Sequence, residues 1–145
     1  MIAKFIGRKE ELQILKGLFN RRSASLIVIK GRRRIGKSRL LEEFSKAFQK
    51  SFKFSGLPPK KELEPTTSQS QRDEFAIRLA KQTNTSDFNK DDWTELFWHL
   101  ANYTKHGRVL IIFDEISWMG SKDPNFLGKL KNAWDLSFKK MINLF

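Results

Sequence analysis

An α/β domain with a parallel sheet is the fold class that this sequence predicts, and two observations predict it. Short β-branched or apolar runs, each the length of one buried strand, recur along the chain. Between them lie amphipathic segments of helical periodicity, in the order β-α-β-α-α-β-α. Such alternation is typical of parallel strands joined by helical crossovers. The length of 145 residues suits a single domain, residues 1–145.

The first half of the chain predicts two helices and two strands. A helix after Gly7 places four apolar side chains on one face: Leu12, Leu15, Leu18 and Phe19. Residues 25–30 form a β-branched run that predicts a buried strand, and residues 31–36 predict a loop. Residues 37–49 show helical spacing of Leu40, Leu41, Phe44, Ala47 and Phe48. Phe52 and Phe54 alternate with polar residues, so 51–55 predicts a second strand, broken by Gly56 and the prolines after it.

The second half predicts three helices and one more strand. Residues 60–70 are polar and read as a loop, and residues 71–82 as a helix with Phe75 and Leu79 on one face. Asp91 or Asp92 is expected to cap a further helix that ends at His106-Gly107. Residues 108–113 are a continuous apolar run, predicting a third strand. A loop over 119–124 and a helix over 126–141 complete the prediction.

The composition is that of a globular chain. Hydrophobic residues make up 39% and charged residues 30%, which is enough for a packed core. The longest apolar run, Val109 to Phe113, is far shorter than the ~20 residues of a membrane span. The sequence has no cysteine, which excludes disulfides and thiolate metal sites, and its first residues do not form a signal peptide. We therefore expect a cytoplasmic protein with no membrane partner.

The net charge of +12 raises the alternative of a nucleic-acid-binding module, because basic proteins are attracted to polyanions. The lysines and arginines are spread along the chain, so a solvated surface explains them as well. Aromatic residues such as Trp93 and Trp98 could stack on bases, but their helical spacing favours a role in the core. A steep salt dependence of DNA binding would support the nucleic-acid alternative.

A phosphate-binding loop is predicted directly after the first strand. The pattern G-x-x-x-x-G-K-S is matched by Gly31, Arg32, Arg33, Arg34, Ile35, Gly36, Lys37 and Ser38. Glycines let such a loop wrap closely around phosphate, and backbone N–H groups and the following helix N-terminus attract its charge. Lys37 is expected to reach the β- and γ-phosphates of ATP, and Ser38 to bind Mg²⁺. The three arginines occupy variable positions, where solvated charge explains them better than phosphate contact.

Two adjacent carboxylates, Asp114 and Glu115, follow the third strand. In a P-loop nucleoside triphosphatase the first acid holds Mg²⁺, usually through water, and the second can act as a general base on the attacking water. The alternative is an acidic turn or helix cap, and the phosphate loop earlier in the chain argues against it. The adjacent pair also favours a hydrolase of the AAA type over a small-molecule kinase.

The motifs together resemble a known family, the archaeal-type AAA ATPases of prokaryotes, which are relatives of the STAND signalling NTPases. The resemblance spans nearly the whole chain. It includes Phe5 to Glu11 before a leucine-rich helix, the phosphate loop continued through Arg39 to Phe44, and the strand Ile111 to Ile116. It implies that Ile6, Gly7 and Arg8 lie near the adenine, that residues 31–39 form the Walker A segment, and that Asp114 and Glu115 are the Walker B pair.

The resemblance also implies parts that this sequence lacks. Such ATPases have a five-stranded core, with a polar sensor residue after the fourth strand and an arginine supplied later. Here residues 141–145 resemble the beginning of that fourth strand, so we expect a three-stranded P-loop sheet flanked by helices and truncated before the fourth core strand. A truncated remnant, one fragment of a split protein and a homo-oligomer are all compatible with this. Slow or absent ATP hydrolysis and aggregation of the isolated chain are expected.

Overall fold

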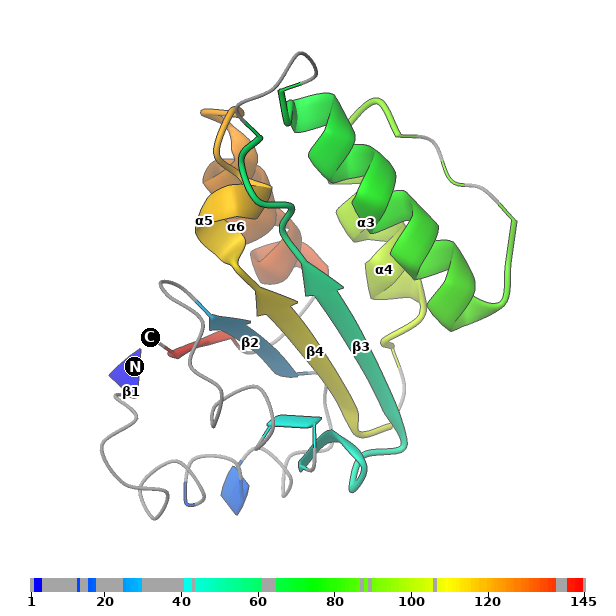
Figure 1. Cartoon of the computed structure of the whole chain (residues 1–145). Helices are drawn as coiled ribbons and strands as arrows, with labels where there is room; N and C mark the ends of the chain where they lie inside the picture. Colours follow the sequence, from blue (N-terminus) through cyan, green and yellow to red (C-terminus); the bar gives the residue numbers. More distant parts are fainter. Residues whose placement is uncertain are drawn as a thin grey trace.

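The computed structural model describes residues 2–3, 13, 16–17, 25–29, 41–42, 44–60, 65–86, 88, 90–105, 107–137 and 141–144. Within these residues the strands form one parallel sheet, and the longer helices lie on one face of it (Figure 1). The strand order is β1-β5-β2-β4-β3. The strands are β1 (Ile2–Ala3), β2 (Ser25–Ile29), β3 (Lys50–Ser55), β4 (Val109–Asp114) and β5 (Met141–Leu144).

The three predicted strands are confirmed. β2, β4 and β3 lie side by side in parallel, and each differs from its predicted range by at most one residue at either end. Their register pairs Val28 with Phe113 and Ser55 with Asp114. β4 lies between two strands, and all six of its residues are buried. Its apolar run from Val109 to Phe113 predicts this burial.

The expectation that the sheet ends with three strands is corrected by β5 and β1. β5 pairs in parallel with β2 on the side away from β4, and β1 pairs with β5. Residues 141–144 therefore form a strand of this sheet and do not merely precede one. The physical reason is that the otherwise open edge of β2 offers unpaired backbone groups to any short extended segment nearby. β5 therefore covers the edge of β2 that faces away from β4.

The helices agree with the prediction except at some ends. α3 spans Ser68–Thr83 and begins three residues earlier than predicted, because Thr67 and Ser70 form a reciprocal capping box. α4 spans Trp93–Asn102 with Asp92 as its cap, and it ends before His106-Gly107. α6 spans Phe126–Ser137, and the short α5, Ile116–Met119, was not predicted. Leu41, Glu42, Phe44 and Ser45 are helical, as expected for the helix after the predicted loop.

The main core lies between the sheet and helices α3, α4 and α6. Alternate strand residues such as Val28, Phe54 and Phe113 point into it and meet Phe75, Trp93, Phe97 and Phe126. Phe75 stacks on Phe54 with ring centroids 4.1 Å apart. Leu110 and Ile112, the intervening residues of β4, are equally buried but lie outside this cluster, on the opposite face of the sheet. Among the described strands, β4 is therefore buried on both faces of the sheet.

Candidate functional site

The carboxyl ends of β2 and β4 meet at one edge of the sheet. The two strands are direct neighbours, and continuing their register by one residue places Ile29 beside Asp114. The next strand along, β3, ends beside the same residue, since Ser55 pairs with Asp114. The predicted loop starts at Gly31, two positions after Ile29 in the chain. The sheet therefore brings Ile29, the last described residue before that predicted loop, and the acidic pair to one edge.

The direction of the chain reverses between these two strands. The chain crosses from β2 to β3 in one direction over β4, and from β3 to β4 and then β4 to β5 in the other. Parallel crossovers are right-handed, so connections in opposite directions cover opposite faces of the sheet. Consistent with this, α4 and α6 pack together on one face (Figure 1). In open α/β proteins, ligands bind at the carboxyl edge beside such a switch point.

Both acidic residues are buried at this edge. Asp114 and Glu115 are each 5% exposed. Asp114 is the last residue of β4, and strand alternation directs it to the same face as Leu110 and Ile112. Glu115 has a left-handed backbone, with φ 53° and ψ 49°, and its carbonyl oxygen accepts bonds from the N–H groups of Trp118 and Met119. A left-handed residue other than glycine is uncommon and is often associated with functional sites.

The turn that carries Glu115 packs on the end of β3. The Gly56 N–H donates to the Asp114 carbonyl oxygen at 3.0 Å. A Cβ atom added to Gly56 would lie 2.5 Å from the Glu115 carbonyl oxygen and 2.5 Å from the Met119 nitrogen. Next along the chain, the N–H and C=O of Leu57 pair with the side-chain amide of Gln71 at 2.8 and 2.9 Å. The end of β3 therefore lies against the turn after β4, and α3 holds the residue that follows Gly56.

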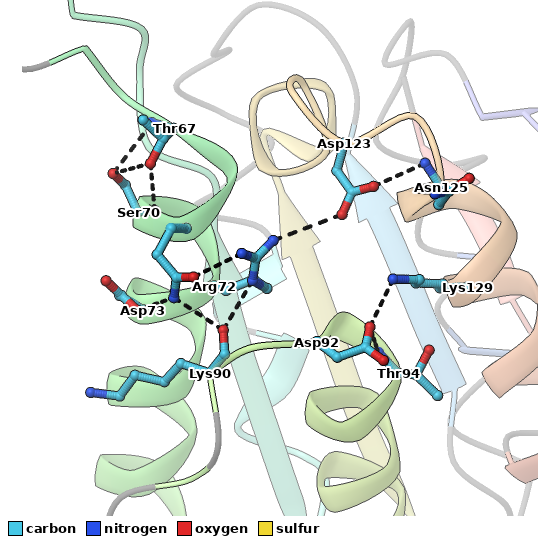
Figure 2. Close-up of polar contacts among 11 residues, drawn as sticks. Thr67, Ser70, Arg72, Asp73, Lys90, Asp92, Thr94, Asp123, Asn125 and Lys129 are labelled. Carbon is cyan, nitrogen blue, oxygen red and sulfur yellow. Dashed lines mark hydrogen bonds and ion pairs between the residues drawn. The ribbon is translucent and has the colours of Figure 1, made fainter.

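A polar network holds the connection from β4 to α6 (Figure 2). Arg72 of α3 reaches Asp123 at 3.9 Å, and its side chain also donates to the Lys90 carbonyl oxygen at 2.9 Å. Asp123 in turn accepts from the Asn125 N–H just before α6. Lys129 of α6 donates to Asp92, the cap of α4, at 2.7 Å. This hydrogen bond from Lys129 is the main reason that the pKa of Asp92 lies below its ordinary value.

Only part of the predicted site falls within the described residues. Asp114 and Glu115 are described, and they lie adjacent and buried at the carboxyl edge of the sheet. The predicted adenine-side residues Ile6, Gly7 and Arg8 lie outside the described residues. So do all members of the predicted phosphate-binding segment: Gly31, Arg32, Arg33, Arg34, Ile35, Gly36, Lys37, Ser38 and Arg39. Among the described residues, no three His, Cys, Asp or Glu side chains gather as a metal cluster.

Gly56 is the feature of this edge that the sequence analysis missed. It was interpreted only as a break after the second strand, because glycine before two prolines indicates a turn. Its close approach to the turn after β4 joins residues almost sixty positions apart, so no local pattern indicates it. Glycine at the end of a strand is a weak signal of close backbone approach.

A parallel sheet flanked by helices, with buried carboxylates at its switch point, defines the class of protein as an open α/β domain. Residues 5–143 match the family described as an ATPase domain predominantly from Archaea, and the chain belongs to that family. It is 46% identical over 43 residues to an uncharacterised ATP-binding protein of Methanocaldococcus jannaschii, an alignment covering 30% of this chain and 73% of that protein. No solved structure matches the chain.

The described helices also bear on the membrane question. None of them is long and apolar enough to cross a bilayer.

Proposed function

We propose that this chain binds ATP with Mg²⁺ at the carboxyl edge between β2 and β4. The observation that carries the proposal is the buried Asp114–Glu115 pair, one strand away from the strand that leads into G-x-x-x-x-G-K-S. Two residues span at most about 7 Å, so a loop that starts at Gly31 would begin near the acids, which supports the proposal. The family and the name of the archaeal relative support ATP as the nucleotide.

Each residue of the site has a proposed role. Gly31 to Arg39 surround the phosphates, with Lys37 as the charge on the β- and γ-phosphates. Ile6, Gly7 and Arg8 are proposed to lie near the adenine. A buried carboxylate oxygen and a hydroxyl oxygen are donors that Mg²⁺ accepts, so Asp114 and Ser38 fit a magnesium site completed by water. When bound there, Mg²⁺ would neutralise charge on the phosphates.

Hydrolysis of ATP is proposed as the activity of this family's domain. Glu115 follows the metal-binding acid and would accept the proton of the attacking water as a general base. Glu115 has a left-handed backbone, whereas Asp114 is the last residue of a strand. This difference in backbone conformation suits two acids with different tasks. The adjacent Asp-Glu pair favours a hydrolase of the AAA and STAND-related type over a kinase.

The test is binding of a fluorescent ATP analogue to the purified chain with and without Mg²⁺. Lys37→Ala should reduce affinity at least about tenfold, because it removes the charge that meets the phosphates. Lys105→Ala is the matched control, since Lys105 is exposed between α4 and β4, at the other edge of the sheet. Affinity of the Lys37 variant within about twofold of the natural chain, a difference below 0.5 kcal/mol, would show that the phosphate-loop assignment is wrong.

A further inference from the structure

We infer that Gly56 is a positioning residue for the Asp114–Glu115 pair: the missing side chain lets the end of β3 hold the turn after β4 in the shape that directs both carboxylates. This inference rests on the proposed function, because it assigns Gly56 a role in the magnesium dependence of nucleotide binding. It concerns a residue that would itself touch neither nucleotide nor metal.

Space, not backbone conformation, requires glycine at this position. Among the described glycines only Gly107 has a positive φ, so Gly56 adopts a backbone that other residues also adopt. What distinguishes Gly56 is that an added Cβ would meet backbone atoms at 2.5 Å. The same addition at Gly120 would meet mainly the Phe126 side chain, and at Gly17 and Gly128 it would meet nothing within 4 Å.

The atoms that Gly56 approaches are those that define the acidic turn. The Met119 N–H donates to the Glu115 carbonyl oxygen at 3.1 Å, and this bond closes the first turn of α5. A methyl group on Gly56 would contact both partners of that bond. Either the bond breaks or the whole turn moves away from β3, and in both cases the left-handed conformation of Glu115 loses its support.

Gly56 and Leu57, at the end of β3, are held in place by hydrogen bonds. The Gly56 N–H is bonded to the Asp114 carbonyl oxygen, which ties the position of Gly56 to the end of β4. The next residue, Leu57, is held through both backbone groups by the Gln71 amide. Gln71 itself is 3% exposed within α3. A larger residue at position 56 therefore shifts the acids rather than β3.

The experiment compares Gly56→Ala with Gly128→Ala, a glycine substitution in open space within α6. Binding of the fluorescent ATP analogue is measured over a series of Mg²⁺ concentrations and in EDTA. For Gly56→Ala we expect the Mg²⁺ concentration at half-maximal binding to rise about tenfold while affinity in EDTA stays within about twofold. Gly128→Ala should change neither value. A simple loss of folded protein would lower both affinities together, so the split between them identifies positioning.

Two additions make the result decisive. In an Asp114→Asn background, Gly56→Ala should cause no further change in the Mg²⁺ requirement, because the affected ligand is already gone. If Gly56→Ala does not fold, Gln71→Met removes the clamp on Leu57 without adding bulk at position 56, and we expect a smaller shift in the same direction.

The outcomes separate the inference from the proposed function. The positioning role is wrong if a folded Gly56→Ala variant has the same Mg²⁺ requirement as the natural chain. Where Gly56→Ala does not fold, an unchanged Mg²⁺ requirement in Gln71→Met has the same meaning. Neither result contradicts the proposed ATP site. An equal shift in the Asp114→Asn background would overturn the positioning role too. If the natural chain shows no magnesium-dependent nucleotide binding, the proposed function fails and the positioning role with it.

Discussion

At the scale of the residue, Asp114 and Glu115 are neighbours in sequence with different backbone conformations. Asp114 ends a regular strand, whereas Glu115 takes a left-handed conformation that starts α5. Both side chains are buried, and burial of two adjacent carboxyl groups is costly unless partners or cations compensate. Two acids held at one edge in different backbone conformations suit two different tasks.

The first prediction separates those tasks. Asp114→Asn should make ATP binding less dependent on Mg²⁺, because it weakens a metal ligand, whereas Glu115→Gln should leave binding of ATP with Mg²⁺ nearly unchanged. Isothermal titration of both variants with and without Mg²⁺ provides the measurement. Equal losses of affinity in both variants, with the magnesium requirement intact, would contradict the assignment of separate roles.

At the scale of the element, the start of α4 depends on one side chain. Asp92 caps the helix through the Thr94 N–H at 3.2 Å and also binds Lys129 of α6. Its pKa is lowered mainly by the hydrogen bond from Lys129, so the folded state favours the ionised form. The stability that this provides is present above the unfolded pKa of about 3.9 and is lost as pH falls through the lower folded pKa.

The second prediction uses this pH dependence. Asp92→Asn keeps a capping side chain but removes the charge, so it should destabilise the fold by at most about 1 kcal/mol at neutral pH, since the pair is partly exposed. The difference from the natural chain should shrink as pH falls through the lowered folded pKa of Asp92, and it should vanish where Asp92 is protonated in both states. Urea unfolding at several pH values measures it. A difference that persists in the Lys129→Gln background would contradict the role of this pair.

The packing of α3 on the sheet depends on one aromatic residue. Phe75 is 2% exposed, stacks on Phe54 and meets Phe113 and Trp93 edge-on at 5.6 and 5.3 Å. It therefore joins α3 to β3, β4 and α4 at once. Aromatic contacts of this geometry stabilise a core beyond the area that they bury.

The third prediction follows from that position. Phe75→Ala should lower the free energy of unfolding by about 3–5 kcal/mol, because it opens a cavity among rigid rings. Ile77→Ala, on the same helix but 39% exposed, should cost below about 1 kcal/mol. Chemical denaturation of the two variants side by side is the measurement, and similar losses would contradict the assigned core.

At the scale of the whole molecule, the neighbouring strands β2 and β4 form the framework of the proposed site. Residues 116–145 contain lysines but no arginine. An arginine that stabilises the transferring phosphoryl group is worth about 10³–10⁵ in rate. Lys129, one of those lysines, is paired with Asp92 at the start of α4.

The fourth prediction is that this 145-residue chain hydrolyses ATP more slowly than about 1 s⁻¹, the low end of typical enzyme rates. Phosphate release by the purified chain measures it, with Glu115→Gln as the background for contaminating activity. Turnover above that rate, abolished by Glu115→Gln, would show that the charge supplied by an arginine finger comes from elsewhere in the chain.

The sequence by itself determined the features that depend on neighbours along the chain. The unbroken apolar run of β4 predicts burial on both faces, the alternation of Phe52 and Phe54 predicts a strand with one core face, and Asp92 predicts a helix start. The acidic pair was also predicted correctly at the end of its strand. Side-chain periodicity and capping are local, so they can be interpreted without a structure.

Only the tertiary structure decided which segments meet. The pairing of β5 with β2, the direct contact between β2 and β4, and the close approach of Gly56 to Glu115 all join residues far apart in the chain. Two- and four-residue strands such as β1 and β5 carry too little local signal, because their pairing depends on the partner edge. Gly56 carries none, since the backbone that excludes a side chain there belongs to a turn almost sixty residues later.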